Sequence, residues 1–239
     1  MKNKILWLIS ARSGSKSIPN KNIKLLGGHP LLSYRIVTAL KTSIEKDVWL
    51  STDSNEYGLI GQKYGAKLPF IRPIELSEDN STSVEVVLHA MQHAIETGQE
   101  FEFIGLLEPT SPFISTLQLN NAISKLVSEP NADSIIAVKE SRPNTIFIQD
   151  DSKYLDKIAL EIENLQSLGR QNFAKQITPS GGFYISRWNR FLQNKTFYTK
   201  NSIGFLVDEV SGIEIDEPID FLFAQFLIEK NKFNSDVKF

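Results

Sequence analysis

Short apolar runs alternate with helix-forming patterns along most of this 239-residue chain, and this alternation constrains the fold more than any other feature. The runs at 4–10, 48–50, 68–71, 103–107 and 134–138 have the length and composition of buried strands. Strands that alternate with helices form a mostly parallel sheet covered by helices on both faces. The sequence therefore predicts an α/β fold of three layers, α/β/α.

Capping and proline signals set the expected helix boundaries. These signals are, in chain order, Pro30 at a first helical position, Gly65 after a helix over 54–64, and the capping boxes of Thr82 with Glu85 and Ser115 with Gln118. Late in the chain, runs at 182–185 and 212–216 predict further strands, and Pro218 opens a last helix. The expected buried stripe of that helix comprises Ile219, Leu222, Phe223 and Phe226.

The composition excludes several classes of protein. Cysteine is absent, which excludes a disulfide framework, a thiolate metal site and a cysteine nucleophile. The net charge of −2 gives no reason to expect nucleic acid or an acidic membrane as a partner. The apolar stretch behind Lys2 and Lys4 is too short for a signal peptide or a membrane span, so we expect a cytoplasmic protein.

The regular pattern is lost between 139 and 180, where the chain is polar and mixed. We interpret this stretch as an excursion from the sheet, either a lid or a dimerisation arm, inserted in one domain that spans 1–239.

A basic loop, residues 10–22, directly follows the first predicted strand. Its cations are Arg12, Lys16, Lys21 and, just beyond it, Lys24. At the carboxyl end of a strand in a parallel sheet, such a loop is placed to hold a polyanion. Gly14 and the small serines allow backbone N–H groups to approach phosphate oxygens, and an arginine can bind phosphate through two parallel hydrogen bonds. A solvated surface loop is the alternative, but the order of cations and small residues favours a nucleotide site.

Three further polar segments follow predicted strands, at the edge where ligands gather in open α/β sheets. They are Arg72-Pro73 with 79–83, Glu108-Pro-Thr-Ser-Pro, and Glu214-Ile-Asp216. In a strand, Glu214 and Asp216 point to one side, and two aligned carboxylates beside phosphates suit Mg²⁺. An equally weighted alternative is a polar rim in which Asp216 or Glu217 caps the last helix.

Two smaller signals are weaker. His89 and His93 have a helical spacing that can bind zinc, but the glutamate of the metalloprotease pattern is missing, so a packing role is favoured. Thr82 is explained by helix capping, whereas Ser83 is free to face a ligand.

Together these segments resemble the acylneuraminate cytidylyltransferases over nearly the whole chain. The matching motifs are Ala-Arg-Ser-Gly-Ser-Lys-Ser-Ile-Pro-Asn-Lys-Asn-Ile at 11–23, Leu-Gly-Gly-His-Pro-Leu-Leu at 26–32, Ser-Thr-Asp-Ser at 51–54, Arg-Pro-Ile-Glu-Leu-Ser-Glu-Asp at 72–79, Glu-Pro-Thr-Ser-Pro at 108–112 and Gly-Ile-Glu-Ile-Asp-Glu-Pro-Ile-Asp at 212–220. The ordered set is far more specific than any single motif.

The resemblance implies a Rossmann-like nucleotidyltransferase sheet of the GT-A-like type, a homodimer joined by the arm at 139–180, and Mg²⁺ as cofactor. It implies attack by the anomeric hydroxyl of a nonulosonic acid on the α-phosphate of CTP, with release of pyrophosphate. The residues it assigns are Ala11, Arg12, Ser13, Gly14, Ser15, Lys16, Asn22, Arg72 and Ser83 for the nucleotide, Arg12, Lys21 and Asp216 for catalysis, Glu214 and Asp216 for the metal, and Glu108, Thr110, Arg170, Gln171 and Tyr184 for the sugar.

The chain departs from the family pattern mainly on the sugar side. Glu108 stands where a glutamine is usual, Phe113-Ile114 replaces Leu-Arg, Ser180 replaces an asparagine, and Glu214 replaces an aspartate. A carboxylate cannot donate the hydrogen bonds of an amide and repels an anionic substrate. We therefore expect retained CTP chemistry with an altered acceptor, and Glu108 paired with an amino or hydroxyl group of that acceptor.

Other functions stay open at this point. A cytidylyltransferase for another acid, an octulosonate or a phosphonate, has the same fold. The segment Glu214-Ile-Asp216 resembles the acid-any-acid metal motif of nucleotide-sugar glycosyltransferases, but those enzymes generally lack a basic first loop. A non-catalytic nucleotide-binding module is disfavoured by the presence of Arg12, Lys16, Lys21 and Asp216 together.

Overall fold

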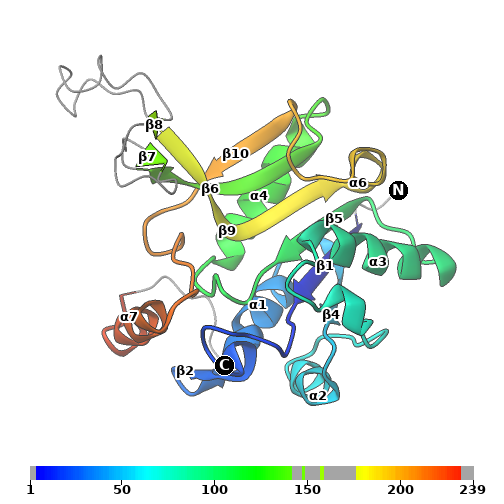
Figure 1. The fold of residues 1–239 in the computed structure, drawn as a ribbon. Coiled ribbons are helices and arrows are strands. Elements are labelled where there is room, and N and C mark those ends of the chain that lie inside the picture. The colour runs from blue at the N-terminus through cyan, green and yellow to red at the C-terminus, as the bar shows by residue number, and fades with distance from the viewer. Residues whose placement is uncertain (1–3, 142–146, 149–156, 159–175, 233–239) are drawn as a thin grey trace, which may run out of the picture.

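A six-stranded sheet forms the centre of the chain in the computed structural model, which describes residues 4–141, 147–148, 157–158 and 176–232 (Figure 1). The strand order is β10-β6-β9-β5-β1-β4. These strands are β1 (Lys4–Ser10), β4 (Glu45–Ser51), β5 (Phe103–Leu107), β6 (Ser134–Ser141), β9 (Gln176–Arg187) and β10 (Ser202–Leu206). Strand β9 runs antiparallel to both neighbours, and the other pairs are parallel. The predicted mostly parallel sheet is confirmed.

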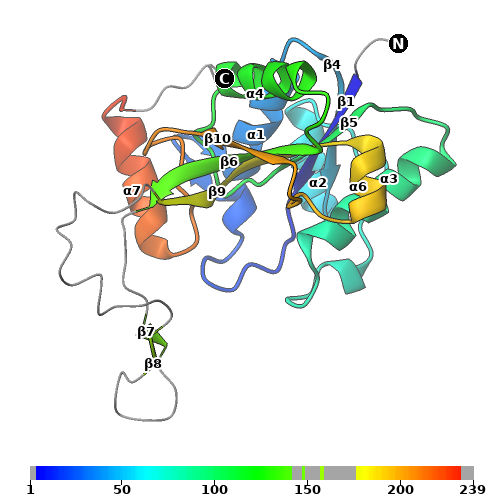
Figure 2. The same ribbon diagram turned by 90° about the horizontal axis from the view of Figure 1, so that it is seen from above.

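Helices cover both faces of this sheet, which confirms the three layers (Figure 2). On β1, Ile5, Trp7 and Ile9 pack against one layer, and the alternate Leu6 and Leu8 pack against the other. The first layer contains α1 (Leu31–Leu40), α2 (Asn55–Lys63) and α4 (Thr116–Ser128). The second contains α3 (Ser83–Glu96) and α6 (Trp188–Asn194).

The predicted helix signals are largely confirmed. Both capping boxes form, with Thr82 and Ser115 as N-cap residues of α3 and α4. Gly65 follows α2 with a φ of 98°, the left-handed conformation that glycine adopts without a Cβ penalty. Pro30 is the N-cap of α1 rather than its first helical residue, so that boundary was predicted one position early.

Two predicted strands are wrong. Residues 68–71 do not join the sheet, because the chain pairs with β4 one residue earlier, at a single bridge between Trp49 and Lys67. Residues 212–216 are not a strand either: the amide of Ile215 donates to the carbonyl oxygen of Thr110 at 2.8 Å, and no ladder forms among the described residues. An apolar run predicts burial, and Ile215 is indeed buried, but it does not guarantee a strand partner.

The predicted stripe of the last helix, α7 (Pro218–Glu229), lies on the wrong face. Proline opens the helix as expected, but the side chains packed against the body are Phe221, Ala224 and Leu227. The predicted stripe is at least half exposed, with relative exposures of 68% for Ile219, 62% for Leu222 and 50% for both Phe223 and Phe226. Apolar residues occupy both faces of α7, so periodicity alone cannot select the face that packs on Leu31 and Tyr34.

Short elements connect the main ones. They are η1 (Lys21–Ile23), β2 (Leu25–Leu26), β3 (His29–Pro30), η2 (Ile74–Leu76), β7 (Phe147–Ile148) and β8 (Lys157–Ile158). Of the predicted excursion at 139–180, residues 139–141 and 176–180 belong to β6 and β9, and β7 pairs with β8. Its remainder lies outside the described residues, so the lid or dimerisation arm stays a prediction. Among the helices that the structure describes, none has the length and apolarity needed to cross a membrane.

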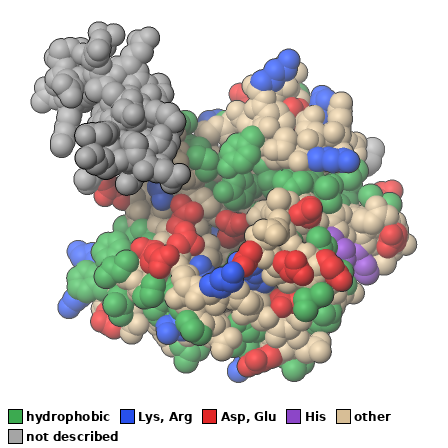
Figure 3. Space-filling model, viewed as in Figure 1, with side chains coloured by type: hydrophobic (Ala, Val, Ile, Leu, Met, Phe, Trp, Pro, Cys, Tyr) green, Lys and Arg blue, Asp and Glu red, His purple; other side chains and the backbone are tan. Residues whose placement is uncertain are grey.

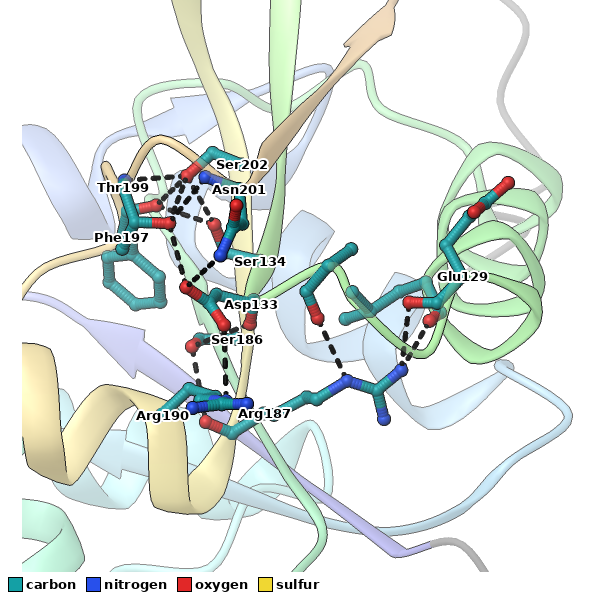
Figure 4. A network of polar contacts seen from close by, with 12 residues as sticks. Glu129, Asp133, Ser134, Ser186, Arg187, Arg190, Phe197, Thr199, Asn201 and Ser202 are labelled. Carbon is teal, nitrogen blue, oxygen red and sulfur yellow. Dashed lines mark hydrogen bonds and ion pairs between the residues drawn. The ribbon is translucent and has the colours of Figure 1, made fainter.

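A polar network closes the end of the sheet where β6 begins and β9 ends (Figure 4). Asp133 accepts from Thr199 Oγ1 at 3.0 Å and forms an ion pair with Arg190 Nε at 3.2 Å. The Arg187 guanidinium donates to the carbonyl oxygens of Leu126 at 2.8 Å and Ala132 at 2.9 Å. These contacts tie α4, β6, β9 and α6 together at the end opposite to the carboxyl ends of β1, β4 and β5.

Gly105 allows the Trp7 ring to lie against β5. The two residues are paired in the β1–β5 register, and a methyl group on Gly105 would come within 2.3 Å of the indole. We expect Gly105→Ala to lower the free energy of unfolding by about 1–3 kcal/mol, because the buried ring has no room to move. Urea denaturation measures this change. Gly14→Ala is the control for stability, since its methyl group would meet nothing within 4 Å; equal stability of both variants would contradict this packing.

Candidate active site

The four polar segments predicted to follow strands meet around one cavity of about 470 Å³. It opens at the carboxyl ends of β1, β4 and β5, where ligands gather in open α/β sheets. Basic and acidic side chains lie next to one another near the middle of this face of the molecule (Figure 3). The lining residues are Ser10, Arg12, Ser15, Lys16, Ser17, Lys21, Asn22, Arg72, Leu76, Glu78, Asp79, Ser81, Thr82, Ser83, Val86, Glu108, Pro109, Thr110 and Asp216.

The basic loop supplies three of its four expected cations to the cavity: Arg12, Lys16 and Lys21. Lys24 points elsewhere, with its ammonium 5.2 Å from the centre of the Phe221 ring. Gly14 lines a smaller neighbouring cavity together with Arg12 and Lys16. The basic loop therefore brings three positive charges to the main cavity instead of the four that the sequence suggested.

Ala11 and Ser13 hold the basic loop in place rather than offering free N–H groups. The Ala11 amide donates to the carbonyl oxygen of Ser51 at 3.0 Å. The amide and hydroxyl of Ser13 both donate to the Asp53 carboxylate, at 2.9 and 2.6 Å. The Ser13 hydrogen bonds help to keep the pKa of Asp53 below its usual range despite partial burial. Asp53 thus anchors this loop to the end of β4.

Arg72 and Asn22 are buried beside the cavity. Arg72 donates from Nε to Ser77 Oγ and from Nη1 to Ser10 Oγ, both at 3.0 Å. Burial lowers its pKa, the nearby Asp53 opposes this change, and its Nη2 has no hydrogen-bond partner in the described part of the chain. Asn22 donates to the carbonyl oxygen of Arg12 at 2.9 Å. Arg72 therefore contributes to the cavity lining a guanidinium whose Nη2 donates no hydrogen bond within the described residues.

Lysines balance the two carboxylates of Glu214-Ile-Asp216. Lys21 Nζ lies 2.9 Å from the carbonyl oxygen of Ile215 and 3.4 Å from Asp216 Oδ1. Glu214 Oε1 lies 3.0 Å from Lys139 Nζ. Ile215, which separates the two acids in sequence, is buried. Asp216 lines the main cavity, whereas Glu214 lines a separate cavity together with Lys139. Both carboxylates are close enough to Glu108 to raise its pKa.

Glu108 lies among like charges at the end of β5. Its pKa is raised to about 7, mainly by burial and then by the carboxylates of Glu214 and Asp216, against the attraction of Lys21. Its Oε1 accepts from Ser83 Oγ at 3.4 Å, a weak contact. Glu108 forms no ion pair with any residue that the structure describes, so a ligand that donates hydrogen bonds would satisfy it.

The remaining predicted sugar residues are partly placed. Thr110 lines the cavity next to Glu108. Tyr184 lies close to this glutamate, since burial and the Glu108 charge both raise the pKa of Tyr184. Arg170 and Gln171 lie outside the described residues. His89 and His93 pack edge-on against Phe70, with ring centres 4.5 and 5.1 Å away, in agreement with a packing role.

Comparisons with known proteins agree with this geometry. A family model described as "Cytidylyltransferase" matches residues 6–202. The chain belongs to this cytidylyltransferase family. Its members are nucleotidyltransferase enzymes, and the acylneuraminate resemblance drawn from the motifs is confirmed.

Several curated relatives of this cytidylyltransferase are about equally similar to it. The chain is 31% identical to an N-acylneuraminate cytidylyltransferase of Escherichia coli over 96% of its own length, but it spans only 53% of that relative. It is 30% identical to the CMP-N,N'-diacetyllegionaminic acid synthase of Legionella pneumophila, covering 96% of this chain and 98% of the relative. A pseudaminic acid cytidylyltransferase of Campylobacter jejuni is 30% identical, with 97% and 98% covered.

Solved structures share the cytidylyltransferase fold at lower identity. A CMP:2-keto-3-deoxy-manno-octonic acid synthetase, solved in complex with CTP, superposes with a TM-score of 0.69 and 16% identity. The match covers 96% of this chain and 100% of that one. It establishes the α/β fold of the chain.

Sequence reasoning gave no role to three residues that organise the cytidylyltransferase site. Asp53 anchors the basic loop, Asp79 pairs with its cations, and Arg35 supports the segment after β5. Arg35 is fully buried in α1, donates to the carbonyl oxygens of Ile114 at 3.0 Å and Gly182 at 3.1 Å, and has its pKa lowered to about 9 by burial. Asp53 and Asp79 both belong to motifs that carry the family resemblance. Their partners, Ser13 and Arg12, lie 40 or more residues away in the basic loop, so the sequence alone did not indicate these contacts.

The raised pKa of Glu108 makes a prediction about stability. A carboxyl whose pKa rises from 4.5 to about 7 on folding binds more protons in the folded chain over that interval. The free energy of unfolding therefore falls as pH rises through it. We expect Glu108→Gln to raise the melting temperature relative to wild type more at about pH 8 than at about pH 5. Thermal denaturation at both values tests this, with the exposed Glu100→Gln as control; a pH-independent difference would contradict it.

Proposed function

We propose that this cytidylyltransferase transfers CMP from CTP to the anomeric hydroxyl of a nonulosonic acid. The observation that supports this most is the convergence of Arg12, Lys16 and Lys21 with Asp216, the second carboxylate of the acidic segment Glu214-Ile-Asp216, around one cavity. The relatives named above act, by their names, on acylneuraminate, diacetyllegionaminic acid and pseudaminic acid. Three related acids among the relatives make this class the first choice for the acceptor.

The reaction needs alignment and charge neutralisation more than covalent help from the protein. The anomeric oxygen forms a bond to the α-phosphorus and loses its proton, and the bond from that phosphorus to the bridging oxygen of pyrophosphate breaks. In this proposal Arg12, Ser15, Lys16 and Asn22 bind the triphosphate, and Arg72 and Ser83 bind the nucleoside. Lys21, whose side chain is only 12% exposed, neutralises charge at the reacting phosphate.

The acidic segment fits Mg²⁺ as a cofactor. Glu214 and Asp216 are hard oxygen donors, and Mg²⁺ typically binds one or two carboxylates together with substrate phosphates. The carboxylates of both residues raise the pKa of Glu108, so negative charge accumulates here despite Lys21 and Lys139. Glu214 and Asp216 would hold the ion, which would neutralise phosphate charge when bound.

The acceptor is proposed to meet the protein at Glu108, Thr110 and Tyr184. Glu108 has an unsatisfied acceptor and lies where burial disfavours its charge, so an amino or hydroxyl group of the acid would complement it. Arg170 and Gln171, a homodimer joined by the arm at 139–180, and a cytoplasmic location remain parts of the proposal.

Pyrophosphate release tests the proposed function directly. We would incubate the purified protein with CTP, Mg²⁺ and one acid at a time from sialic, legionaminic, pseudaminic and octulosonic acids. Release that depends on a nonulosonic acid and on CTP, rather than on UTP, is the expected result. Release with octulosonic acid alone would move the acceptor to that class. Tight CTP binding without release from any acid would indicate a non-catalytic module.

Lys21 and Asp216 are expected to be necessary for turnover. Removing preorganised charge at a transferring phosphoryl group typically costs a factor of about 10²–10³ in kcat. We therefore expect Lys21→Ala and Asp216→Ala each to lower kcat by at least about 10²-fold with an unchanged melting temperature. Lys24→Ala is the matched control, because Lys24 belongs to the same region but faces Phe221. Wild-type turnover in either site variant would contradict the assignment.

A further inference from the structure

One carboxylate occupies two of the cations that are proposed to bind the triphosphate. Asp79 Oδ1 lies 3.0 Å from Arg12 Nη1, and Asp79 Oδ2 pairs with Lys16 Nζ. The Lys16 ammonium and the Arg12 guanidinium lower the pKa of Asp79, so its charge persists well below neutral pH. We call this arrangement, Arg12–Asp79–Lys16, the Asp79 bridge.

The Asp79 bridge borders two cavities. Arg12, Lys16, Glu78 and Asp79 line both the main cavity of about 470 Å³ and a second one of about 440 Å³. The second cavity is completed by Gly14, Ser77 and Asn80. The three charged groups of the bridge therefore lie where the two cavities adjoin along the basic loop.

The turn that carries Asp79 is fastened at its base rather than at Asp79 itself. Ser77 accepts from Arg72 at its hydroxyl, at 3.0 Å, and from Arg12 at its carbonyl oxygen, at 3.4 Å. Ser81 donates to the carbonyl oxygen of Glu75, and its amide donates to that of Glu78 at 3.2 Å. Asp79 lies at the tip between these two anchors, so its carboxylate can leave the cations while the turn stays in place.

Phosphate oxygens and the Asp79 carboxylate compete for the same donors. An intramolecular carboxylate is held near its partners at a high effective concentration, so an incoming anion must displace it. Once displaced, Asp79 also repels the bound phosphates. A triphosphate offers several charges to each cation, whereas pyrophosphate without the nucleoside has fewer contacts to offset this competition.

We propose that Asp79 competes with phosphate groups for Arg12 and Lys16 and so weakens both the binding of CTP and the retention of pyrophosphate. This inference rests on the proposed function, because it takes the Arg12 and Lys16 side chains to be the triphosphate ligands. A ligand without phosphate groups, such as cytidine, does not meet this competition.

Calorimetric titration of the full chain with CTP, pyrophosphate and cytidine in the presence of Mg²⁺ tests this role. Exposed ion pairs are weak, so removing one is expected to change an affinity by a factor of no more than about five. We expect Asp79→Asn to tighten the binding of CTP and pyrophosphate by roughly fivefold and to leave cytidine binding unchanged. In turnover assays, we expect the same variant to be inhibited by correspondingly lower concentrations of pyrophosphate.

Glu78→Gln is the matched control. It removes one negative charge at the adjacent position, which lines both cavities but forms no ion pair with the described residues. We expect it to change the affinities by less than about twofold. Unchanged or weaker CTP and pyrophosphate binding in Asp79→Asn, or equal tightening in Glu78→Gln, would overturn the inference. If the wild-type chain bound no CTP, the proposed function itself would fail, and the role of Asp79 with it.

Discussion

Parallel pairing of β1 between β4 and β5 is the constraint on which the whole site depends. The register aligns Ile9 of β1 with Leu50 of β4 and with Leu107 of β5, so the three strands end at the same level. The basic loop, Asp53 and Glu108 follow these ends directly. The sheet thereby brings residues about 40 and 100 positions apart to one edge, where contacts such as those of Ser13 with Asp53 can form. Two buried contacts support this edge. The Trp7 ring packs against Gly105, and Arg35 donates to the carbonyl oxygen of Ile114 in the segment after β5.

Charges of both signs are close together around the cavity. Arg12 and Lys16 pair with Asp79, and the Glu108 carboxyl is affected by the carboxylates of Glu214 and Asp216. Lys21 contacts the acidic segment at Ile215 and Asp216. Such preorganised charges can supply the electrostatic stabilisation that phosphoryl transfer needs.

The fold and most of the site could be predicted because they follow from local patterns. Buried runs, capping boxes and strand ends gave the sheet, the helices and the four polar segments. The errors arose where tertiary contacts decide between equivalent local choices. Helix α7 has apolar residues on both faces, and only its packing against Leu31 and Tyr34 selects Phe221 for burial. Residues 212–216 are extended and partly buried, but their neighbour is the loop at Thr110 instead of a strand.

The roles of single side chains could be predicted only in part. The sequence identified the cations, yet it could not show that Asp79 pairs with two of them or that Asp53 takes both donors of Ser13. These contacts join segments that are far apart in the sequence but close together in space. The departure at Glu108 was visible as an unusual residue, but its raised pKa results from burial and from Glu214, which arrives from more than 100 residues away.

A crystal structure with a non-hydrolysable CTP analogue and Mg²⁺ tests the central claim most directly. If the strand ends of β1, β4 and β5 form a nucleotide site, the triphosphate will lie between Arg12, Lys16 and Lys21, with the cation on the side of Asp216. A nucleotide bound elsewhere, or phosphates that leave these three cations untouched, would contradict the account.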